Sequence, residues 1–332
     1  MTDLDGMAAV VIGRNEGLRL EPALKSVQGA GLPLVYVDSG SVDGSPRRAR
    51  EMGVAVVEVD PRTPFSAGRG RNEGLQEVLK RWPNTRFVLF LDGDCILDPR
   101  FPPAALGAFD QHEECAIITG HLSERFPDRS VYNRLCAIEW QSPSGLMTNM
   151  NSLGGIMVVR VSAFLSVGGF KLQAIAGEEP DLGSRLITAG HTIIKVDAPM
   201  ATHDAEILKF SQWWKRAARG GHALAFRYSQ HGRTNVRETR RELASDLAWG
   251  LILPVSLILL LWPTDGLSLL LLIVYPLFGW RIFRRHRANG LNSADARLLA
   301  RYIVFGKFAH VVGIATYCRN RLRGEFRIIE YK

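Results

Sequence analysis

Two aspartates stand one residue apart at the end of an apolar run: Asp92 and Asp94 follow residues 87–91, FVLFL. Carboxylates this close repel each other, and a divalent cation shared with a diphosphate relieves that repulsion. Oxygen ligands of this kind suit Mn²⁺ or Mg²⁺. The alternative is a solvated turn in which Asp98 caps a helix, but the apolar residues before the pair argue against it. We therefore predict a metal site here.

Other groups with acid–base or ligand chemistry lie later in the chain. Glu178, Glu179 and Asp181 follow Gly177 at a predicted helix start, where a carboxylate could act as a general base on an acceptor hydroxyl. Acidic first turns also serve simply as helix caps, because the helix dipole favours anions there. His203 follows a predicted strand and could complete cation coordination as a neutral imidazole, although a lone histidine is more often structural.

The scaffold for these groups is predicted from alternating segments. Apolar runs at 8–13, 33–41, 54–60 and 87–91 predict strands, and 18–31, 45–53 and 71–82 predict helices. This alternation indicates βαβ units and a mostly parallel sheet, in which ligands bind beyond the carboxyl ends of the strands. Residues 151–203 read as the second half of the same domain, with strands at 151–160 and 191–203 and helices at 161–170 and 177–190. The polar residues that follow the first two strands are Asn15, Glu16, Asp38, Ser39, Ser41 and Asp43.

The stretch 68–74, GRGRNEG, looks at first like a dinucleotide-binding fingerprint. Its spacing is GxGxxxG and it does not follow the first strand, so that interpretation fails on both counts. Arg69 and Arg71, near a predicted helix start, are candidates for contacts with a diphosphate or a base edge.

Beyond residue 241 the chain becomes strongly apolar. Residues 247–263 and 266–280 carry no charged side chain, and a two-residue turn separates them. The two segments predict two membrane spans with both flanks in the cytoplasm. A buried helical hairpin is the alternative. A third segment, about 298–318, contains Lys307 and His310, and we expect an interfacial or re-entrant helix. The predicted domains are therefore 1–240, with an amphipathic interfacial helix at 207–228, and a membrane region at 241–332.

The amphipathic helix 207–228 interleaves aromatic and cationic side chains. Indoles can stack on a sugar or anchor the helix at a bilayer, and cations can reach phosphates; a plain interfacial helix is the alternative. The expected acceptor or phosphate contacts, together with Asp181, are Gln212, Trp213, Trp214, Arg216 and Arg219.

Charge and cysteine usage narrow the partners. The net charge of +8 owes much to arginines clustered around the apolar segments of the second half, which suggests anionic phospholipids. A nucleic-acid partner is not expected, because the chain has no zinc-knuckle spacing, RNA-binding signature or basic recognition helix in its first half. Four scattered cysteines fit reduced thiols, and the N-terminus lacks a secretory signal. We expect the N-terminal part in the cytoplasm.

Together these segments resemble the family 2 glycosyltransferases, whose catalytic domain has the GT-A fold. The matching pieces are VVIGRNEG, VDSGSVDGS, GRGRNEGL, FLDGDC and GEEPDLGSRL, in the family's order and within about residues 7–220. The resemblance implies inverting transfer of a sugar from a nucleotide-diphosphate donor, which we expect to be a UDP-sugar. It also implies a nucleotide-sugar site, whose residues would be Gly13, Asn15, Glu16, Asp38, Ser39, Asp43, Arg69, Arg71, Asp92 and Gly93.

The resemblance also assigns roles. Asp38 would contact the base and Asp92 the ribose or the cation, while Asp94, joined by His203, would ligate the cation. The family's acidic motif usually ends in an aspartate that acts as the base; here Glu179 occupies that position, with Glu178 as the second choice.

The family's processive synthases carry QxxRW. Here Gln212 is followed by Lys215 and Arg216, so the motif is broken. This favours a single transfer to a lipid-linked or membrane-surface acceptor, in cell-envelope glycan or glycolipid synthesis at a bacterial-type inner membrane. The rival interpretations are a catalytically silent scaffold of a polysaccharide assembly complex, a sugar nucleotidyltransferase, and a transporter with a cytosolic domain. Oligomeric state and complex partners are left open.

Overall fold

The computed structural model describes residues 4–172, 174, 176–231 and 237–324. The chain divides into two compact units. We call Met1–Phe126 with Glu139–Ala205 the sheet unit, and Pro127–Ile138 with Glu206–Lys332 the helical unit.

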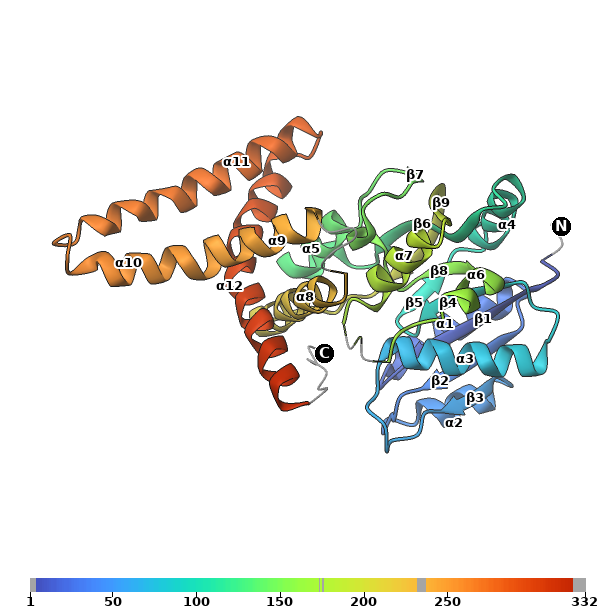
Figure 1. The fold of residues 1–332 in the computed structure, drawn as a ribbon. Coiled ribbons are helices and arrows are strands. Elements are labelled where there is room, and N and C mark those ends of the chain that lie inside the picture. The colour runs from blue at the N-terminus through green and yellow to red at the C-terminus, as the bar shows by residue number, and fades with distance from the viewer. Residues whose placement is uncertain (1–3, 173, 175, 232–236, 325–332) are drawn as a thin grey trace. The chain divides into compact units, whose positions relative to one another are not determined.

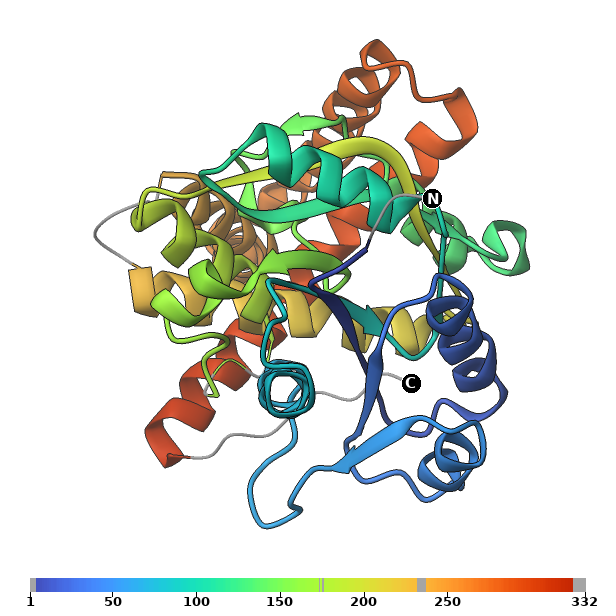
Figure 2. The same ribbon diagram turned by 90° about the vertical axis from the view of Figure 1, so that its right-hand side faces the viewer.

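The sheet unit is built on one mixed sheet. Its first four strands are parallel and adjacent in the order β3-β2-β1-β4 (Figures 1 and 2), as the βαβ pattern predicted. Beyond β4 the order continues β8-β6-β9-β5, where β8 is antiparallel to both neighbours and β6 and β9 are parallel. The strands are β1 (Met7–Gly13), β2 (Leu34–Asp38), β3 (Ala55–Glu58), β4 (Phe87–Asp92), β5 (Cys95–Leu97), β6 (Cys115–Glu124), β7 (Gly145–Leu146), β8 (Met157–Arg160) and β9 (Thr192–His203).

Helices cover both faces of this sheet because alternate strand residues point to opposite sides. Ala9 and Val11 of β1 pack with α1 (Leu20–Gly29), α2 (Ser45–Glu51) and α4 (Phe101–Gln111). Ala8 and Val10 pack with α3 (Ala67–Arg81), α6 (Val161–Ser166) and α7 (Glu178–Thr188). In Figure 2 the blue helices α1 and α2 and the cyan α3 lie on opposite sides of the first strands. Short 3-10 turns occupy Gly17–Arg19 and Met150–Ser152 in this unit and Pro127–Arg129 in the helical unit.

The helical unit consists of long helices around α12 (Ser293–Arg323). The others are α5 (Val131–Glu139), α8 (Phe210–His231), α9 (Arg237–Leu247), α10 (Leu253–Leu261) and α11 (Val274–Ala288), with a π-helical turn at Ala248–Ile252 and a 3-10 turn at Leu267–Ile273. Glycines let the helices approach closely: a Cβ on Gly221 would lie 2.2 Å from the His310 carbonyl oxygen, and one on Gly313 1.8 Å from that of Ala218. α8 and α12 therefore pack almost backbone to backbone.

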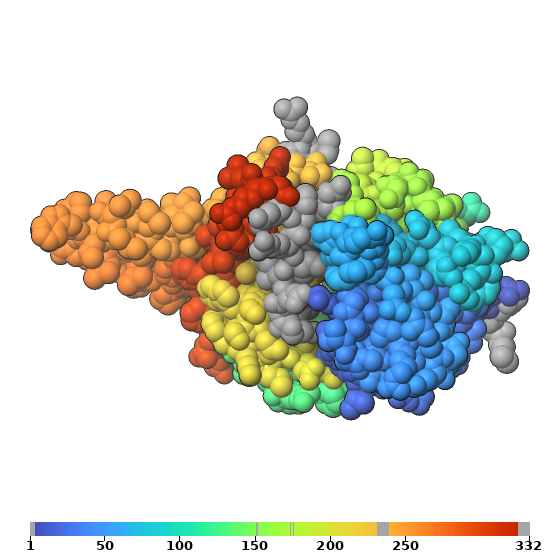
Figure 3. Space-filling model, turned by 90° about the horizontal axis from the view of Figure 1, so that it is seen from below, coloured from blue at the N-terminus to red at the C-terminus, as the bar shows by residue number. Residues whose placement is uncertain are grey.

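Three stretches of the described helices are long and apolar enough to cross a membrane: Thr239–Leu261, Leu267–Ala288 and Ser293–Arg323. The first two form a hairpin whose leucines are largely exposed; Figure 3 shows it in orange, extending away from α12 in red. The two predicted spans lie within this hairpin, and the apolar helices fit the predicted membrane anchor. An interfacial position for 298–318 stays a prediction, because α12 also has the length and composition of a span.

Candidate active site

The centre of the candidate site is the guanidinium of Arg71, which projects from α3 and is 1% exposed. Its Nη2 donates to Asp92 Oδ1 at 2.9 Å, and its Nη1 donates to Glu179 Oε1 at 2.8 Å. Glu178 Oε1 lies 3.9 Å from Nη1. Burial by itself would lower the pKa of Arg71, but the charges of Asp92, Glu179 and Glu178 outweigh it and raise that pKa. One buried cation thus joins the end of β4 to the start of α7.

The backbone beside Arg71 must be glycine. A Cβ on Gly155 would lie 2.2 Å from Arg71 Nη2, too close unless the guanidinium moves, and 3.0 Å from Asp92 Oδ2, a tight contact. We predicted a strand over 151–160, but β8 begins only at Met157. Gly155, two residues before it, instead lies against the ion pair. A glycine pair at the start of a predicted strand is the sequence signal that could have indicated such an approach.

The three acids of α7 differ in accessibility. The Glu179 side chain is 16% exposed, that of Glu178 is 3% exposed and that of Asp181 is fully buried. Asp181 pairs with Arg185 at 2.8 Å and with Lys171 at 3.6 Å, which holds α7 in place. The geometry therefore favours Glu179 over Glu178 as the base, and a direct acceptor contact from Asp181 would require it to leave these ion pairs.

A separate group of metal-ligating atoms includes Asp94, two residues beyond Asp92 in the chain. Among the described residues, one oxygen of Asp94, the sulfur of Cys95 and one ring nitrogen of His203 all lie within 4.8 Å of one another. His203 Nε2 is 3.4 Å from Asp94 Oδ2. This grouping follows from the sheet, because β5 pairs with β9 and places Cys95 opposite His203. Asp92 lies outside the group, against Arg71, so the cation contact expected from it stays a prediction.

Two residues that sequence reasoning missed surround the His203 ring. Glu124, at the end of β6, has its Oε2 3.7 Å from His203 Nδ1 and accepts the backbone N–H groups of Ala205 and Phe126 at 3.2 Å. The Trp140 ring stands perpendicular to the imidazole, with centroids 4.8 Å apart. These contacts turn Nε2 toward Asp94. No local pattern marked either residue, since both lie far from His203 in sequence.

The residues after β1 and β2 form a second cluster. Asp38 is 1% exposed and accepts hydrogen bonds from the Tyr36 hydroxyl at 2.8 Å and from the N–H groups of Gly40 and Ser41 at 3.0 and 2.7 Å. Burial, followed by the charge of Asp38, raises the pKa of Tyr36 far above its usual range. Asp38 therefore shapes the loop after β2, and a contact with a base stays a prediction.

Asn15 and Asp43 tie this loop to the one after β1. Asn15 has a left-handed φ of 55°; its N–H donates to Ser41 Oγ at 2.8 Å, and its Oδ1 accepts from the N–H of Val42 at 2.8 Å. Asp43 accepts from the N–H of Gly17 at 2.8 Å. The loops thus form one rigid polar surface beyond the strands.

Glycine is needed where β1 and β4 meet beside Glu16. A Cβ on Gly13 would lie 2.9 Å from Glu16 Cγ, and one on Gly93 would lie 3.0 Å from the same atom. The Gly93 N–H donates to the Ile12 carbonyl at 2.7 Å, and Ser39 N donates to the Gly13 carbonyl at 3.0 Å. The predicted nucleotide-site residues of three strands are therefore brought together at one edge of the sheet.

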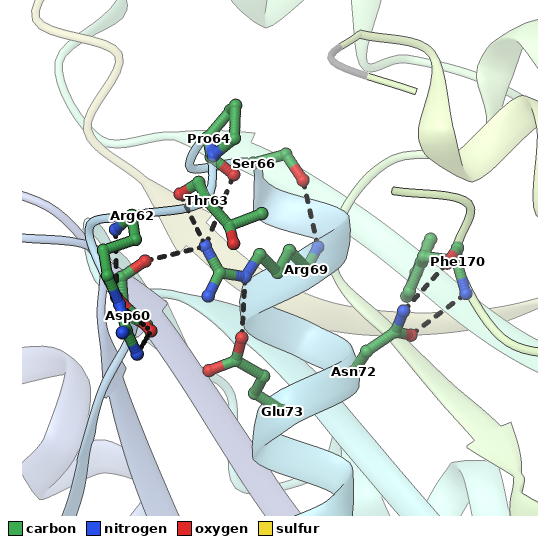
Figure 4. Close-up of polar contacts among 9 residues, drawn as sticks. All are labelled: Asp60, Arg62, Thr63, Pro64, Ser66, Arg69, Asn72, Glu73 and Phe170. Atoms are coloured by element: carbon green, nitrogen blue, oxygen red, sulfur yellow. Dashed lines mark hydrogen bonds and ion pairs between the residues drawn. The ribbon is translucent and has the colours of Figure 1, made fainter. Parts of the chain in front are cut away.

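The Arg69 side chain holds the loop that precedes α3. It is 7% exposed, and Figure 4 shows its guanidinium donating to the carbonyls of Asp60 and Thr63 at 3.0 and 2.7 Å and to Glu73 at 2.7 Å. The Ser66 side chain accepts the Arg69 N–H at the start of α3. These bonds fix the loop before α3, so a diphosphate contact from Arg69 would have to compete with them.

Comparison with known proteins identifies the domain family and the fold. Residues 9–167 match the model of the family described as glycosyl transferase family 2. The chain carries a family 2 glycosyltransferase domain. No curated protein sequence matches it. The fold is that of mannosyltransferase PcManGT from Pyrobaculum calidifontis, solved with GDP-Man and Mn²⁺: 15% identity, TM-score 0.63, covering 95% of this chain and 88% of that one. TarS 1–349 of S. aureus is similar at 13% identity and TM-score 0.50, covering 96% and 92%.

The acceptor contacts predicted on α8 lie outside the matched residues, in the helical unit. Gln212 Oε1 accepts the N–H groups of Leu208 and Lys209 and so caps the helix. Trp213 is 4% exposed and packs against Tyr302 with ring centroids 4.7 Å apart, which anchors α8 to α12. The acceptor contacts expected of Gln212, Trp213, Trp214, Arg216 and Arg219 stay predictions.

Proposed function

We propose that the protein is an inverting glycosyltransferase that moves a sugar from a nucleotide-diphosphate donor to a membrane-associated acceptor. The observation that carries the proposal is the bridge made by Arg71 between Asp92 and Glu179. The bridge fixes the distance between Asp92 and Glu179. A donor diphosphate would lie at the strand end beside Asp92, and the acceptor would meet the carboxylate of Glu179. A transferase with one displacement step needs this arrangement.

In the proposed reaction, Glu179 takes the proton of an acceptor hydroxyl as its oxygen attacks the anomeric carbon from the face opposite the leaving group. The attacking oxygen forms the new glycosidic bond, and the bond to the diphosphate breaks with inversion. Arg71 orients the Glu179 carboxylate, while the loops that contain Asn15, Asp38 and Asp43 hold the nucleoside. The partial exposure of Glu179 supports its role, because a base must reach its substrate.

The site residues fit a divalent cation. Asp94 and His203 offer one oxygen and one nitrogen 3.4 Å apart, a separation that allows both to ligate the same ion and leaves positions for phosphate oxygens. When bound, Mn²⁺ or Mg²⁺ would stabilise the negative charge of the departing diphosphate as a Lewis acid. Glu124 would keep the ring of His203 in the required orientation.

The membrane-associated acceptor is proposed from the helical unit. Its exposed apolar hairpin suits lipid, and the end of α11 carries Arg281, Arg284, Arg285 and Arg287, which suit anionic head groups and a cytoplasmic flank. We therefore place the sheet unit on the cytoplasmic side of a bacterial-type inner membrane, acting in envelope glycan or glycolipid synthesis. A lipid-linked or lipid acceptor would meet the site at that surface.

The test is release of nucleoside diphosphate by the full chain in detergent, across UDP-, GDP- and dTDP-sugars with Mn²⁺ or Mg²⁺. We propose a UDP-sugar, but PcManGT was solved with GDP-Man, so GDP-sugars belong in the panel. Turnover of one donor that chelation and Asp94→Ala abolish supports the proposal. Silence on every donor with membrane lipids added would favour a scaffold, and pyrophosphate released from a sugar phosphate and a nucleoside triphosphate would favour a nucleotidyltransferase.

A further inference from the structure

Cys95 adds a sulfur atom to the candidate metal site. It directly follows Asp94, is 0% exposed, and its Sγ lies 3.4 Å from Asp94 Oδ1. In the antiparallel pair β5–β9, Cys95 stands opposite His203, and residues directly opposite each other project from the same face of a sheet. The thiol is therefore held beside the carboxylate and the imidazole by two strands of the sheet.

These three ligand types suit a different class of cation from the one that transfer requires. Carboxylate and phosphate oxygens suit Mn²⁺ and Mg²⁺, whereas a thiolate with an imidazole selects softer ions, Zn²⁺ above all. Ligand atoms in a tetrahedral zinc site lie roughly 3.3 to 3.8 Å apart, given zinc–ligand bonds of about 2.0 to 2.3 Å. The 3.4 Å between His203 Nε2 and Asp94 Oδ2 already matches this spacing. The three ligand atoms lie within 4.8 Å of one another, so the sulfur needs to move only a short distance for all three to bind one ion.

A carboxylate also stands near the other ring nitrogen of His203. Zinc-bound histidines generally have a carboxylate, carbonyl or water against their other ring nitrogen. Glu124 Oε2 stands 3.7 Å from His203 Nδ1, on the side of the ring away from Asp94. The imidazole is thus oriented to present Nε2 to an ion bound by Asp94 and Cys95.

We propose that Asp94, Cys95 and His203 form a three-ligand site for a soft divalent cation, and that Zn²⁺ bound there excludes the hard cation used in transfer. Binding joins Zn²⁺ to the sulfur, and the Cys95 thiol loses its proton to the solvent; no electron is transferred. The inference rests on the proposed function only in that both cations share Asp94 and His203. Free Zn²⁺ would then be a competitive inhibitor with respect to Mn²⁺.

The decisive experiment uses Co²⁺ as a spectroscopic substitute for Zn²⁺, because a thiolate bound to Co²⁺ gives a near-ultraviolet charge-transfer band that oxygen and nitrogen ligands do not. The full chain in detergent carries Cys318→Ser, since Cys318 is the exposed cysteine among the described residues. Cys95→Ser and Cys95→Ala are compared with Cys115→Ser, a matched control at an equally buried cysteine in β6. Thermal unfolding of each variant verifies folding.

We expect the band in the parent and in Cys115→Ser, its absence in both Cys95 variants, and its displacement by Zn²⁺. Zn²⁺ affinity should fall at least about tenfold without the thiolate, while Mn²⁺ affinity changes little. The same band in folded Cys95 variants, or Co²⁺ binding without a band in the parent, would overturn the inference. Neither result bears on the transferase, whose turnover with Mn²⁺ is measured separately.

Discussion

Gly155 leaves the space that the guanidinium of Arg71 occupies: a Cβ at position 155 would stand 2.2 Å from Arg71 Nη2. Gly155→Ala should therefore push Arg71 away from Asp92, and it should lower turnover by at least about tenfold through a displacement of roughly 1 Å. Unfolding free energy should fall by about 1–3 kcal/mol, the usual effect of overpacking.

The neighbouring glycine supplies the control. A Cβ on Gly154 would meet nothing within 4 Å, so Gly154→Ala should retain both turnover and stability. Steady-state kinetics and thermal unfolding of the two variants make the comparison. Equal kinetics for both would mean that the position of Arg71 does not matter for transfer.

Glu179→Gln tests the proposed base. The amide still accepts a hydrogen bond from Arg71 but cannot take a proton, so kcat should fall by about 10²–10⁴-fold. Nucleoside diphosphate affinity, measured by calorimetry, should stay near that of the parent. Glu77→Gln is the control, because Glu77 lies on the same side of α3 as its surface partners Lys80 and Arg81 and contributes only exposed ion pairs. Full activity in Glu179→Gln would remove it from the mechanism.

The sequence predicted the first half of the fold well for a local reason. Strands β1 to β4 are continuous apolar runs separated by amphipathic helices, and the acids after β4 lie at a strand end in any such sheet. Arg71 was predicted at a donor site, which stays a prediction, and the structure pairs it with Asp92 and with Glu179, a partner that the sequence did not indicate. That ion pair spans more than a hundred residues of sequence, beyond the reach of any periodicity.

The surroundings of His203 show the same limit. Glu124 ends β6 and Trp140 lies beyond α5, and only the pairing of β6 with β9 brings Glu124 to the imidazole. Arg69 shows a further limit: its place beside Arg71 suggested a ligand contact, which stays a prediction, and nothing in the sequence indicated that the side chain is buried against loop carbonyls. Residue type and spacing predict which groups can react, and tertiary packing decides which of them are already paired.

Glu124→Gln tests whether this carboxylate orients His203. Loss of a carboxylate beside a ligating histidine typically lowers metal affinity about 10- to 100-fold, and we expect that range for Mn²⁺ measured by electron paramagnetic resonance with nucleoside diphosphate present. Asp197→Asn is the matched control, because Asp197 of β9 contacts His121 of β6 at 2.8 Å, across the same pair of strands but at the surface. Unchanged Mn²⁺ affinity in Glu124→Gln would leave Glu124 with a purely structural role.

Because His222 is buried, we expect the helical unit to lose stability in acid. Burial, with a smaller effect of Arg219, lowers the pKa of His222 from 6.5 to about 4. The unfolded chain therefore binds a proton between pH 6.5 and 4 that the folded chain does not, so the free energy of unfolding decreases as the pH falls through this window. His222→Gln should flatten that part of the profile in thermal unfolding at pH 7, 6 and 5.

The apolar hairpin should account for membrane association. Ile258, Leu259 and Leu270 are 73%, 68% and 70% exposed, and charging all three to glutamate should move most of the protein from the vesicle fraction to the soluble fraction in a flotation assay. Each charge placed in the hydrocarbon costs about 2.5–3.5 kcal/mol, which is enough to reverse partitioning when three are added. Leu18 and Val42 are exposed apolar residues of the sheet unit, and converting both to glutamate is the matched control. Flotation that persists in the triple variant would assign membrane binding to α12 or to the basic segments instead.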